Sequence, residues 1–186
     1  MAESAFDEHR TVRGLEVDGE RVWEVAALRY FETQGGFASA VQAVTGTPLP
    51  RPLGAAALEA AGDGSAGILA WRSPTETLVL GEHAGLVSQI RERVASVPGG
   101  CVVELTGGLR VLRLRGPGVA ELLCRLGGDA VTPAVSEARR GRLADVPVLA
   151  LSVRALETLL VVDRAHAQHL LGWIRATLAD RPGDGD

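Results

Sequence analysis

Short apolar runs bounded by turn residues alternate with helix-like segments through most of this 186-residue sequence, and this order restricts the fold more than any other feature. The apolar runs predict strands over 23–31, 68–71, 77–80, 101–105, 109–114, 147–153 and 158–162. Apolar residues at helical spacing predict helices over 37–44, 86–97, 119–126 and 164–178. From Thr77 onward the order of strands and helices is that of a split βαβ, ferredoxin-like unit. The sequence therefore predicts an α+β fold with an antiparallel sheet core and packed helices.

The segments outside these elements are polar or rich in proline and glycine. Residues 1–20 have mixed charge and predict a flexible N-terminal arm, and residues 181–186 predict a disordered tail. Prolines within 47–56 predict an irregular connecting loop, and the polar, arginine-rich stretch 132–144 predicts an exposed loop. We therefore expect one domain over 21–180, between the arm and the tail.

The composition excludes several classes of function. All 19 Lys-plus-Arg residues are arginine, and the sequence contains no asparagine. The chain therefore cannot form a lysine Schiff base, hold a phosphate with a P-loop lysine or accept an N-linked glycan. Its formal net charge of -4 and its single tyrosine argue against a nucleic-acid partner.

The distribution of apolar residues and cysteines indicates the compartment. No apolar run approaches the roughly 20 residues that cross a membrane, and the N-terminal segment lacks the apolar core of a signal peptide. We therefore expect a cytoplasmic protein without a membrane segment. Cys101 and Cys124 lie in different apolar segments and fit no metal-ligand spacing, so we expect both to be small buried thiols.

Two histidines on the last predicted helix are candidates for chemistry. His166 and His169 are three residues apart, which places them on the face that carries Trp173. Such a pair can supply two metal ligands, but a catalytic zinc site needs a third, and His83 is the other histidine within 21–180. The alternative is a pair of polar residues beside the apolar stripe. We expect no metal site, and we retain His166 as a weak catalytic candidate and His169 as a ligand or partner contact.

Glu104 ends a predicted strand before the turn at 106–108, and Arg110 lies on the predicted return strand. A carboxylate at such a position can orient a ligand or accept a proton, so Glu104 is the other weak catalytic candidate. The alternative is a cross-strand ion pair between Glu104 and Arg110 within a hairpin. Trp71 ends an earlier strand, where it could line a cleft or pack at the edge of the core.

Three arginines alternate with apolar residues along the strand predicted over 109–114 and just beyond it. The alternation predicts that Arg110, Arg113 and Arg115 share an exposed face, although the pattern slips at Val111 and Leu112. Such a face could bind an anion or a partner protein, because guanidinium groups make planar, bidentate contacts with carboxylates. The alternative is a solvated face that is neutralised by nearby carboxylates.

Four segments, taken in order, resemble the gamma subunit of heterotetrameric sarcosine oxidase, within the wider aminomethyltransferase-like, folate-binding group. They are FASAVQAVTGTPLP (37–50), ILAWRSPTETLVL (68–80), ELTGGLRVLRLRGP (104–117) and VVDRAHAQHLLGW (161–173). The sequence departs from the family pattern in having Glu104 for an aspartate, Ala165 for a serine and Thr77 for a tryptophan.

The resemblance implies a folate-transferase-like α+β domain over 21–180 that serves as a non-catalytic accessory subunit of an oxidoreductase complex. Larger flavoprotein subunits would be its partners and would hold the FAD, FMN and NAD, so this chain alone would bind no cofactor. Tetrahydrofolate could occupy a cavity that the chain helps to line. The motif positions that carry over are Trp71, Glu104, Arg110 and Arg164, which we expect to contact a ligand or a partner.

Two alternatives remain open on the sequence. The chain could be a stand-alone small enzyme or ligand-binding protein of the folate-dependent aminomethyltransferase fold, with a cleft around Trp71, Glu104, Arg110 and His166 that takes a folate or a small amine. It could also be a homo-oligomeric module that associates through its arginine-bearing strand. A deep pocket at the four named residues would favour the first alternative.

Overall fold

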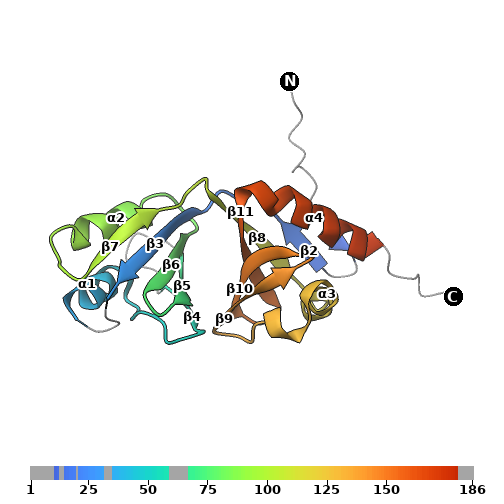
Figure 1. Ribbon diagram of the computed structural model, residues 1–186, viewed down its shortest axis with the longest axis horizontal. Helices are drawn as coiled ribbons and strands as arrows, with labels where there is room; N and C mark the ends of the chain where they lie inside the picture. Colours follow the sequence, from blue (N-terminus) through green and yellow to red (C-terminus); the bar gives the residue numbers. More distant parts are fainter. Residues whose placement is uncertain (1–10, 13–14, 20, 32–34, 59–66, 180–186) are drawn as a thin grey trace, which may run out of the picture.

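Two antiparallel β-sheets pack face to face, and helices cover the outer face of each sheet (Figure 1). The computed structural model describes residues 11–12, 15–19, 21–31, 35–58 and 67–179. The predicted α+β class and antiparallel sheet core are therefore confirmed. No helix in the described part of the chain is long and apolar enough to span a bilayer.

The five-stranded sheet is built mainly from the first half of the chain. Its strands, in spatial order, are β4 (Ala55–Ala57), β5 (Gly67–Ser73), β6 (Glu76–Gly81), β3 (Glu24–Tyr30) and β7 (Gly100–Glu104). The helices α1 (Gly36–Thr45) and α2 (Leu86–Val94) lie on its outer face. Gly46 ends α1 in the left-handed conformation that glycine adopts readily, as the sequence predicts.

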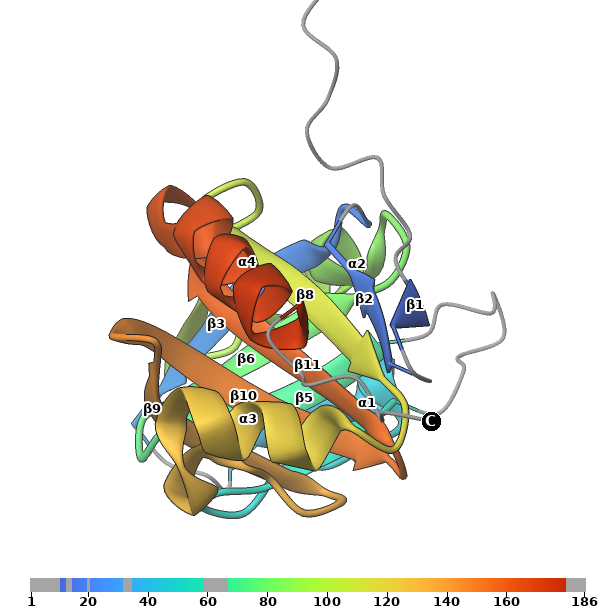
Figure 2. The same ribbon diagram turned by 90° about the vertical axis from the view of Figure 1, so that its right-hand side faces the viewer.

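The six-stranded sheet combines the second half of the chain with an N-terminal segment. Its strands, in spatial order, are β1 (Thr11–Val12), β2 (Leu15–Asp18), β8 (Leu109–Arg115), β11 (Glu157–Asp163), β10 (Val146–Arg154) and β9 (Glu137–Leu143). Figure 2 shows α3 (Val119–Gly127) and α4 (Arg164–Ala179) across its outer face. A short 3-10 helix, η1 (Asp129–Val131), follows α3.

The two sheets repeat one topology. In each, a strand (β3 or β8) is followed by a helix and then by a hairpin (β5–β6 or β10–β11) whose second strand pairs with the first strand of the unit. On its other side β3 pairs with β7, whereas β8 pairs with β2, which precedes both units in the chain. The ferredoxin-like, split βαβ order is thus present twice, and each unit has an additional edge strand, β4 or β9.

Alternation along the strands divides the core into an inter-sheet layer and two helix-covered layers. On β8, Val111 faces the other sheet, whereas Leu112 and Leu114 face the helices. The inter-sheet layer includes buried side chains from both sheets, among them Trp23, Ile68, Leu78, Val111, Leu149 and Val161. Because this apolar layer is shared, each sheet depends on the other to cover its inner face.

Two predictions about local structure are wrong. The segments 101–105 and 109–114 do not form a hairpin, because β7 pairs with β3 while β8 pairs with β11 and β2 in the other sheet. The stretch 132–144 is not simply an exposed loop, because it contains the strand β9. The strand β9 lies at the edge of its sheet, where Ala138 and Leu143 are buried and the arginines between them are partly or fully exposed.

The N-terminal prediction also needs correction. Within the expected flexible arm, Leu15–Asp18 forms β2, which pairs with β8 and buries Leu15. The sequence did not predict this strand, because the segment is largely polar and Leu15 is the one buried residue of the strand. Residues 1–10 and the predicted tail over 181–186 lie outside the described residues. Both cysteines are exposed, contrary to the prediction that they are buried.

Candidate functional site

Arg113 is buried between the two sheets and does not belong to an exposed arginine face. Its Nη2 atom donates to Glu82 Oε1 at 2.8 Å, and its guanidinium lies over the Trp23 ring, 5.0 Å from the ring centroid. Its Nε atom lies 3.9 Å from Glu157 Oε2. Glu82 follows β6, whereas Arg113 and Glu157 belong to the six-stranded sheet. The ion pair between Arg113 and Glu82 therefore connects the two sheets.

Two further arginines complete this group. Arg21 donates to the second oxygen of Glu82 at 2.6 Å, and Arg115 donates through Nε to Glu157 at 2.7 Å. This hydrogen bond to Glu157 raises the pKa of the Arg115 guanidinium. We call Arg21, Glu82, Arg113, Arg115 and Glu157 the closed end of the inter-sheet interface. The opposite charges of this group are paired, as buried charges generally are, although the buried Nε atom of Arg113 has no hydrogen-bond partner among the described residues.

The predicted arginine face is divided by the pleat of β8. Arg110 has the same parity as Leu112 and Leu114 and so lies on the helix-covered side, whereas Arg113 and Arg115 have the opposite parity. Arg110 and Arg115 are partly exposed and Arg113 is buried. The three arginines therefore cannot form one docking surface, and the homo-oligomeric hypothesis loses the feature that motivated it.

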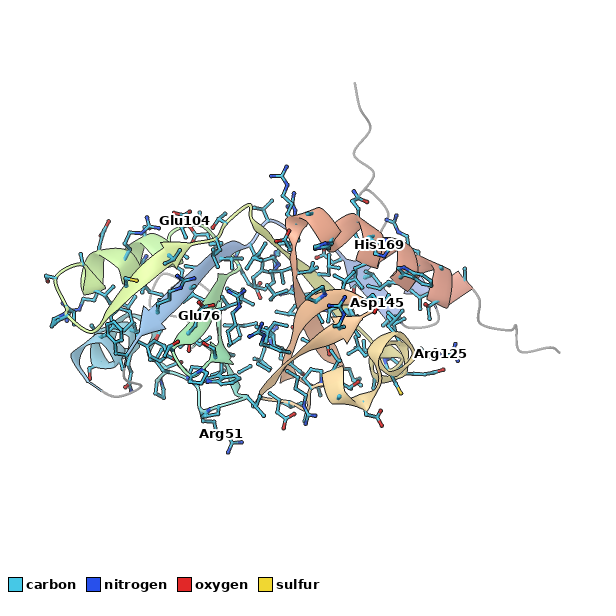
Figure 3. All side chains as sticks on the ribbon, in the orientation of Figure 1. Arg51, Glu76, Glu104, Arg125, Asp145 and His169 are labelled. Atoms are coloured by element: carbon cyan, nitrogen blue, oxygen red, sulfur yellow. The ribbon has the colours of Figure 1, made fainter. Side chains whose placement is uncertain are left out.

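Glu104 forms a surface ion pair with a residue other than the one predicted. Its Oε2 atom accepts from Arg91 Nη2 at 2.7 Å, and both side chains are about half exposed. The cross-strand pair with Arg110 does not form, because the two residues belong to different sheets. Figure 3 shows Glu104 on the side of the five-stranded sheet and His169 on the side of the six-stranded sheet.

The predicted features of α4 lie on its exposed surface. Asp163 Oδ1 accepts the backbone N–H of Ala165 at 2.8 Å, the N-cap that the sequence predicts. Arg164 and His166 are exposed, and the backbone N–H of Arg164 donates to Gly108 at 3.0 Å. His169 Nε2 accepts from the Trp173 indole at 3.2 Å. Among the described residues, no group of three or more metal-binding side chains comes together.

Trp71 lies on the helix-covered side of its sheet. It pairs with Thr77, whose hydroxyl is within 2.9 Å of the Tyr30 hydroxyl in the layer beneath α1 and α2. No hydrogen bond or ion pair among the described residues joins Trp71, Glu104, Arg110 and His166 to one another. The structure therefore does not assemble the cleft that the stand-alone enzyme hypothesis predicts.

An apolar groove lies at one end of the five-stranded sheet, where sequence reasoning identified no site. Phe31 is 87% exposed and borders a cavity of about 660 Å³ with Gly99, Gly100 and Cys101. A side chain at Gly100 would not fit, because its Cβ would lie 2.7 Å from the Phe37 ring. We call Phe31, Gly99, Gly100 and Cys101 the Phe31 groove. A single exposed phenylalanine is not identifiable as a contact residue from sequence.

A second cavity, of about 380 Å³, opens between the sheets. Arg72 borders it from β5, Arg140 and Arg142 border it from β9, and Asp163 borders it from the end of β11. We call these four residues the open end of the inter-sheet interface. Sequence reasoning missed them because β9 was read as a loop, and because residues from both sheets contribute to the cavity.

Comparison with known proteins identifies the fold. No protein-family profile matches the sequence, and no curated protein matches it. Among solved structures, a chain of heterotetrameric sarcosine oxidase from Corynebacterium sp. U-96 is similar, with a TM-score of 0.75 and 22% identity. The match covers 93% of this chain and 88% of that chain.

The glycine cleavage system aminomethyltransferase T from Bartonella henselae is also similar, with a TM-score of 0.65 and 15% identity. The match covers 87% of this chain but 45% of the aminomethyltransferase, so this chain spans less than half of that protein. The chain therefore has the fold shared by this sarcosine oxidase chain and part of the aminomethyltransferase, as the sequence resemblance predicts.

Proposed function

We propose that this chain is a gamma-like accessory subunit of a heteromeric, sarcosine oxidase-type flavoenzyme that oxidises a secondary amine. The observation that carries the proposal is the mutual coverage with the sarcosine oxidase chain, 93% of one and 88% of the other. Each chain matches the other over nearly its whole length. This favours the same role, as one subunit of a complex, over the role of an isolated module.

The positions of the two candidate catalytic residues, Glu104 and His166, support a non-catalytic role. Glu104 is engaged in a surface ion pair with Arg91, and His166 is exposed on α4. Neither side chain lies in an enclosed site that excludes water, which acid–base chemistry generally uses. We therefore propose that FAD, FMN and NAD are held by the larger flavoprotein subunits in the cytoplasm, and that this chain stabilises them. Tetrahydrofolate would occupy a cavity formed jointly with a partner.

The Phe31 groove is the surface that we propose for contact with a larger subunit. A phenylalanine that is 87% exposed gains much from burial in an interface, and aromatic residues are enriched at interface cores. Bare backbone at Gly99 and Gly100 would allow close approach of a partner side chain. The ion pair between Arg29 and Glu76, at 3.0 Å, borders the groove and would lie at the rim of the interface.

The test is isolation of the complex from the native host through an affinity tag on this chain. We expect larger subunits with bound flavin to co-purify, together with oxidation of a secondary amine. The Phe31→Ser variant should lower the yield of the complex, whereas Leu156→Ser, at an exposed position on the β10–β11 turn, should not. A tagged chain that is recovered without a flavoprotein would contradict the proposal. Equal yields from both variants would contradict only the place of the contact.

One observation favours a second function, that of a ligand-binding protein on the folate-transferase fold. The open-end cavity is formed by this chain alone and is bordered by charged side chains from both sheets. Ligand binding there would be compatible with a role as a subunit or with a stand-alone role. Isolation of the tagged chain decides between these roles, because a stand-alone binder would be recovered without large subunits.

A further inference from the structure

The open end contains a guanidinium group that forms no ion pair within the described structure. Arg139 pairs with Glu137 at 2.9 Å, and Arg72 donates to Glu76 at 2.6 Å. Arg142 donates to the backbone oxygen of Asp145. The side chain of Arg140 has no hydrogen bond or ion pair among the described residues. Arg140 is therefore the arginine of the open end that is available to an external anion.

The pleat of β9 directs Arg140 toward the cavity. Ala138 has the same parity and is fully buried in the inter-sheet core, while Gly141 and Leu143 have the opposite parity and pack under α3 and η1. Arg140 and Arg142 thus follow Ala138 along the side of β9 that faces the five-stranded sheet, and both border the cavity.

Apolar side chains form part of the lining of the cavity. Leu78 from one sheet and Leu109, Leu149 and Val161 from the other contribute to its lining, and all four belong to or pack against the inter-sheet core. Binding sites for small molecules commonly combine an apolar lining with a few polar groups that fix the orientation of the ligand. A ligand that fits this cavity has an apolar body and one anionic group directed toward Arg140.

Asp163 limits the charge of that ligand. Its carboxylate borders the same cavity and already accepts the N–H of Ala165. A second negative charge on the ligand would be repelled by Asp163, since like charges in a partly desolvated site oppose each other. The site therefore favours a monocarboxylate over a phosphate or a dicarboxylate.

We propose that the open end binds a small monocarboxylate with an apolar body, whose carboxylate pairs with the Arg140 guanidinium. Arg140 supplies two N–H donors in the geometry that suits a carboxylate, and Arg142 adds positive charge beside it. This inference is independent of the proposed subunit role, because every residue of the site belongs to this chain.

The test is a fluorine NMR titration of the full chain with para-fluorobenzoate and with its uncharged isostere, para-fluorobenzamide. We expect saturable binding of the benzoate and binding of the benzamide that is about tenfold weaker or more, because a charge-assisted pair is lost. Arg140→Gln should weaken benzoate binding by about tenfold or more and leave benzamide binding unchanged.

Arg154→Gln is the matched control, because Arg154 is an exposed arginine on β10 of the same sheet and does not border the cavity. It should bind benzoate as the native chain does. Absence of saturable benzoate binding, equal affinity for benzoate and benzamide, or native affinity in Arg140→Gln would each overturn the proposal. Circular dichroism of each variant would show that the fold is retained.

Discussion

Arginine side chains lie at both ends of the interface between the two sheets, but an ion pair between Arg113 and Glu82 joins the sheets at one end, whereas Arg140 has no ion pair among the described residues at the other. The pairing of β8 with β11 defines the two ends: Arg115 lies opposite Glu157 at the closed end, and Leu109 lies opposite Asp163 at the open end. At the closed end, the side chain of Arg113 is 7% exposed and contacts Glu82 from the other sheet. At the open end, Arg140 is exposed and borders a cavity.

The difference shows how burial determines the role of an arginine. Water solvates an exposed guanidinium, so Arg140 needs no partner for the chain to fold. A buried guanidinium has lost that solvation and must be paired, which makes Arg113 and its carboxylates part of the structure. The same residue type therefore stabilises the fold at one end and remains free to bind a ligand at the other.

The largest expected effect comes from breaking the closed end. Arg113→Met keeps much of the side-chain volume but leaves Glu82 and Glu157 with only Arg21 and Arg115 as partners. We expect the free energy of unfolding in urea to fall by about 3 kcal/mol, because a buried carboxylate becomes poorly compensated. The exposed Arg154→Met variant is the control and should change it by less than about 0.5 kcal/mol. Equal stability of the two variants would refute the structural role of Arg113.

An intermediate effect is expected where β9, the strand that carries the open end, packs against α3. A Cβ at Gly127 would overlap the backbone oxygen of Arg142 and lie 2.7 Å from the Leu143 side chain. We expect Gly127→Ala to lower the free energy of unfolding by about 1–3 kcal/mol through overpacking. At Gly172 on α4 a Cβ meets nothing within 4 Å, so Gly172→Ala should raise it by about 0.5–1 kcal/mol. Thermal or urea unfolding of both variants tests the contrast. A change in the free energy of unfolding with the same sign in both variants would contradict it.

The smallest effect concerns Glu137, which lies at the other end of β9 from Arg142. Hydrogen bonds from the Ala134 N–H and from Arg139 hold the pKa of Glu137 below its ordinary value. A lowered pKa in the folded state means that the stabilisation is present above the unfolded pKa of about 4.3 and is lost as the pH falls below it. We expect Glu137→Gln to be slightly less stable than the native chain at neutral pH, with the difference disappearing in acid. Urea unfolding at several pH values would measure it, and a difference that grows in acid would contradict the assignment.

The sequence predicts the parts of the fold whose periodicity is clear. The hairpins β5–β6 and β10–β11 and the helices were predictable because their apolar residues recur at the spacing of the element. The strand β9 was not, because its buried residues Ala138 and Leu143 are separated by arginines and a glycine. The assignment of β7 and β8 to different sheets was not predictable either, because a short turn at 106–108 is typical of a hairpin.

The candidate sites were less predictable than the fold. Arg110, Arg113 and Arg115 look equivalent in sequence, and their different burial depends on Glu82, which lies 31 positions from Arg113. Whether Arg140 has a charged partner depends on which carboxylates the fold places near it and on whether other arginines already pair with them. Such information is tertiary, since it arises when the two sheets pack, and local sequence patterns do not contain it.

The difference between the two ends can be measured directly by unfolding the native chain and Arg140→Gln in urea, with and without para-fluorobenzoate. Without the ligand, the two free energies of unfolding should agree within about 0.5 kcal/mol, because Arg140 is exposed. At a benzoate concentration of about ten times the native Kd, the native chain should gain about 1.4 kcal/mol and Arg140→Gln about 0.4 kcal/mol or less. A loss of stability in Arg140→Gln without benzoate, or the same gain in both proteins with it, would contradict the distinction between a structural end and a binding end.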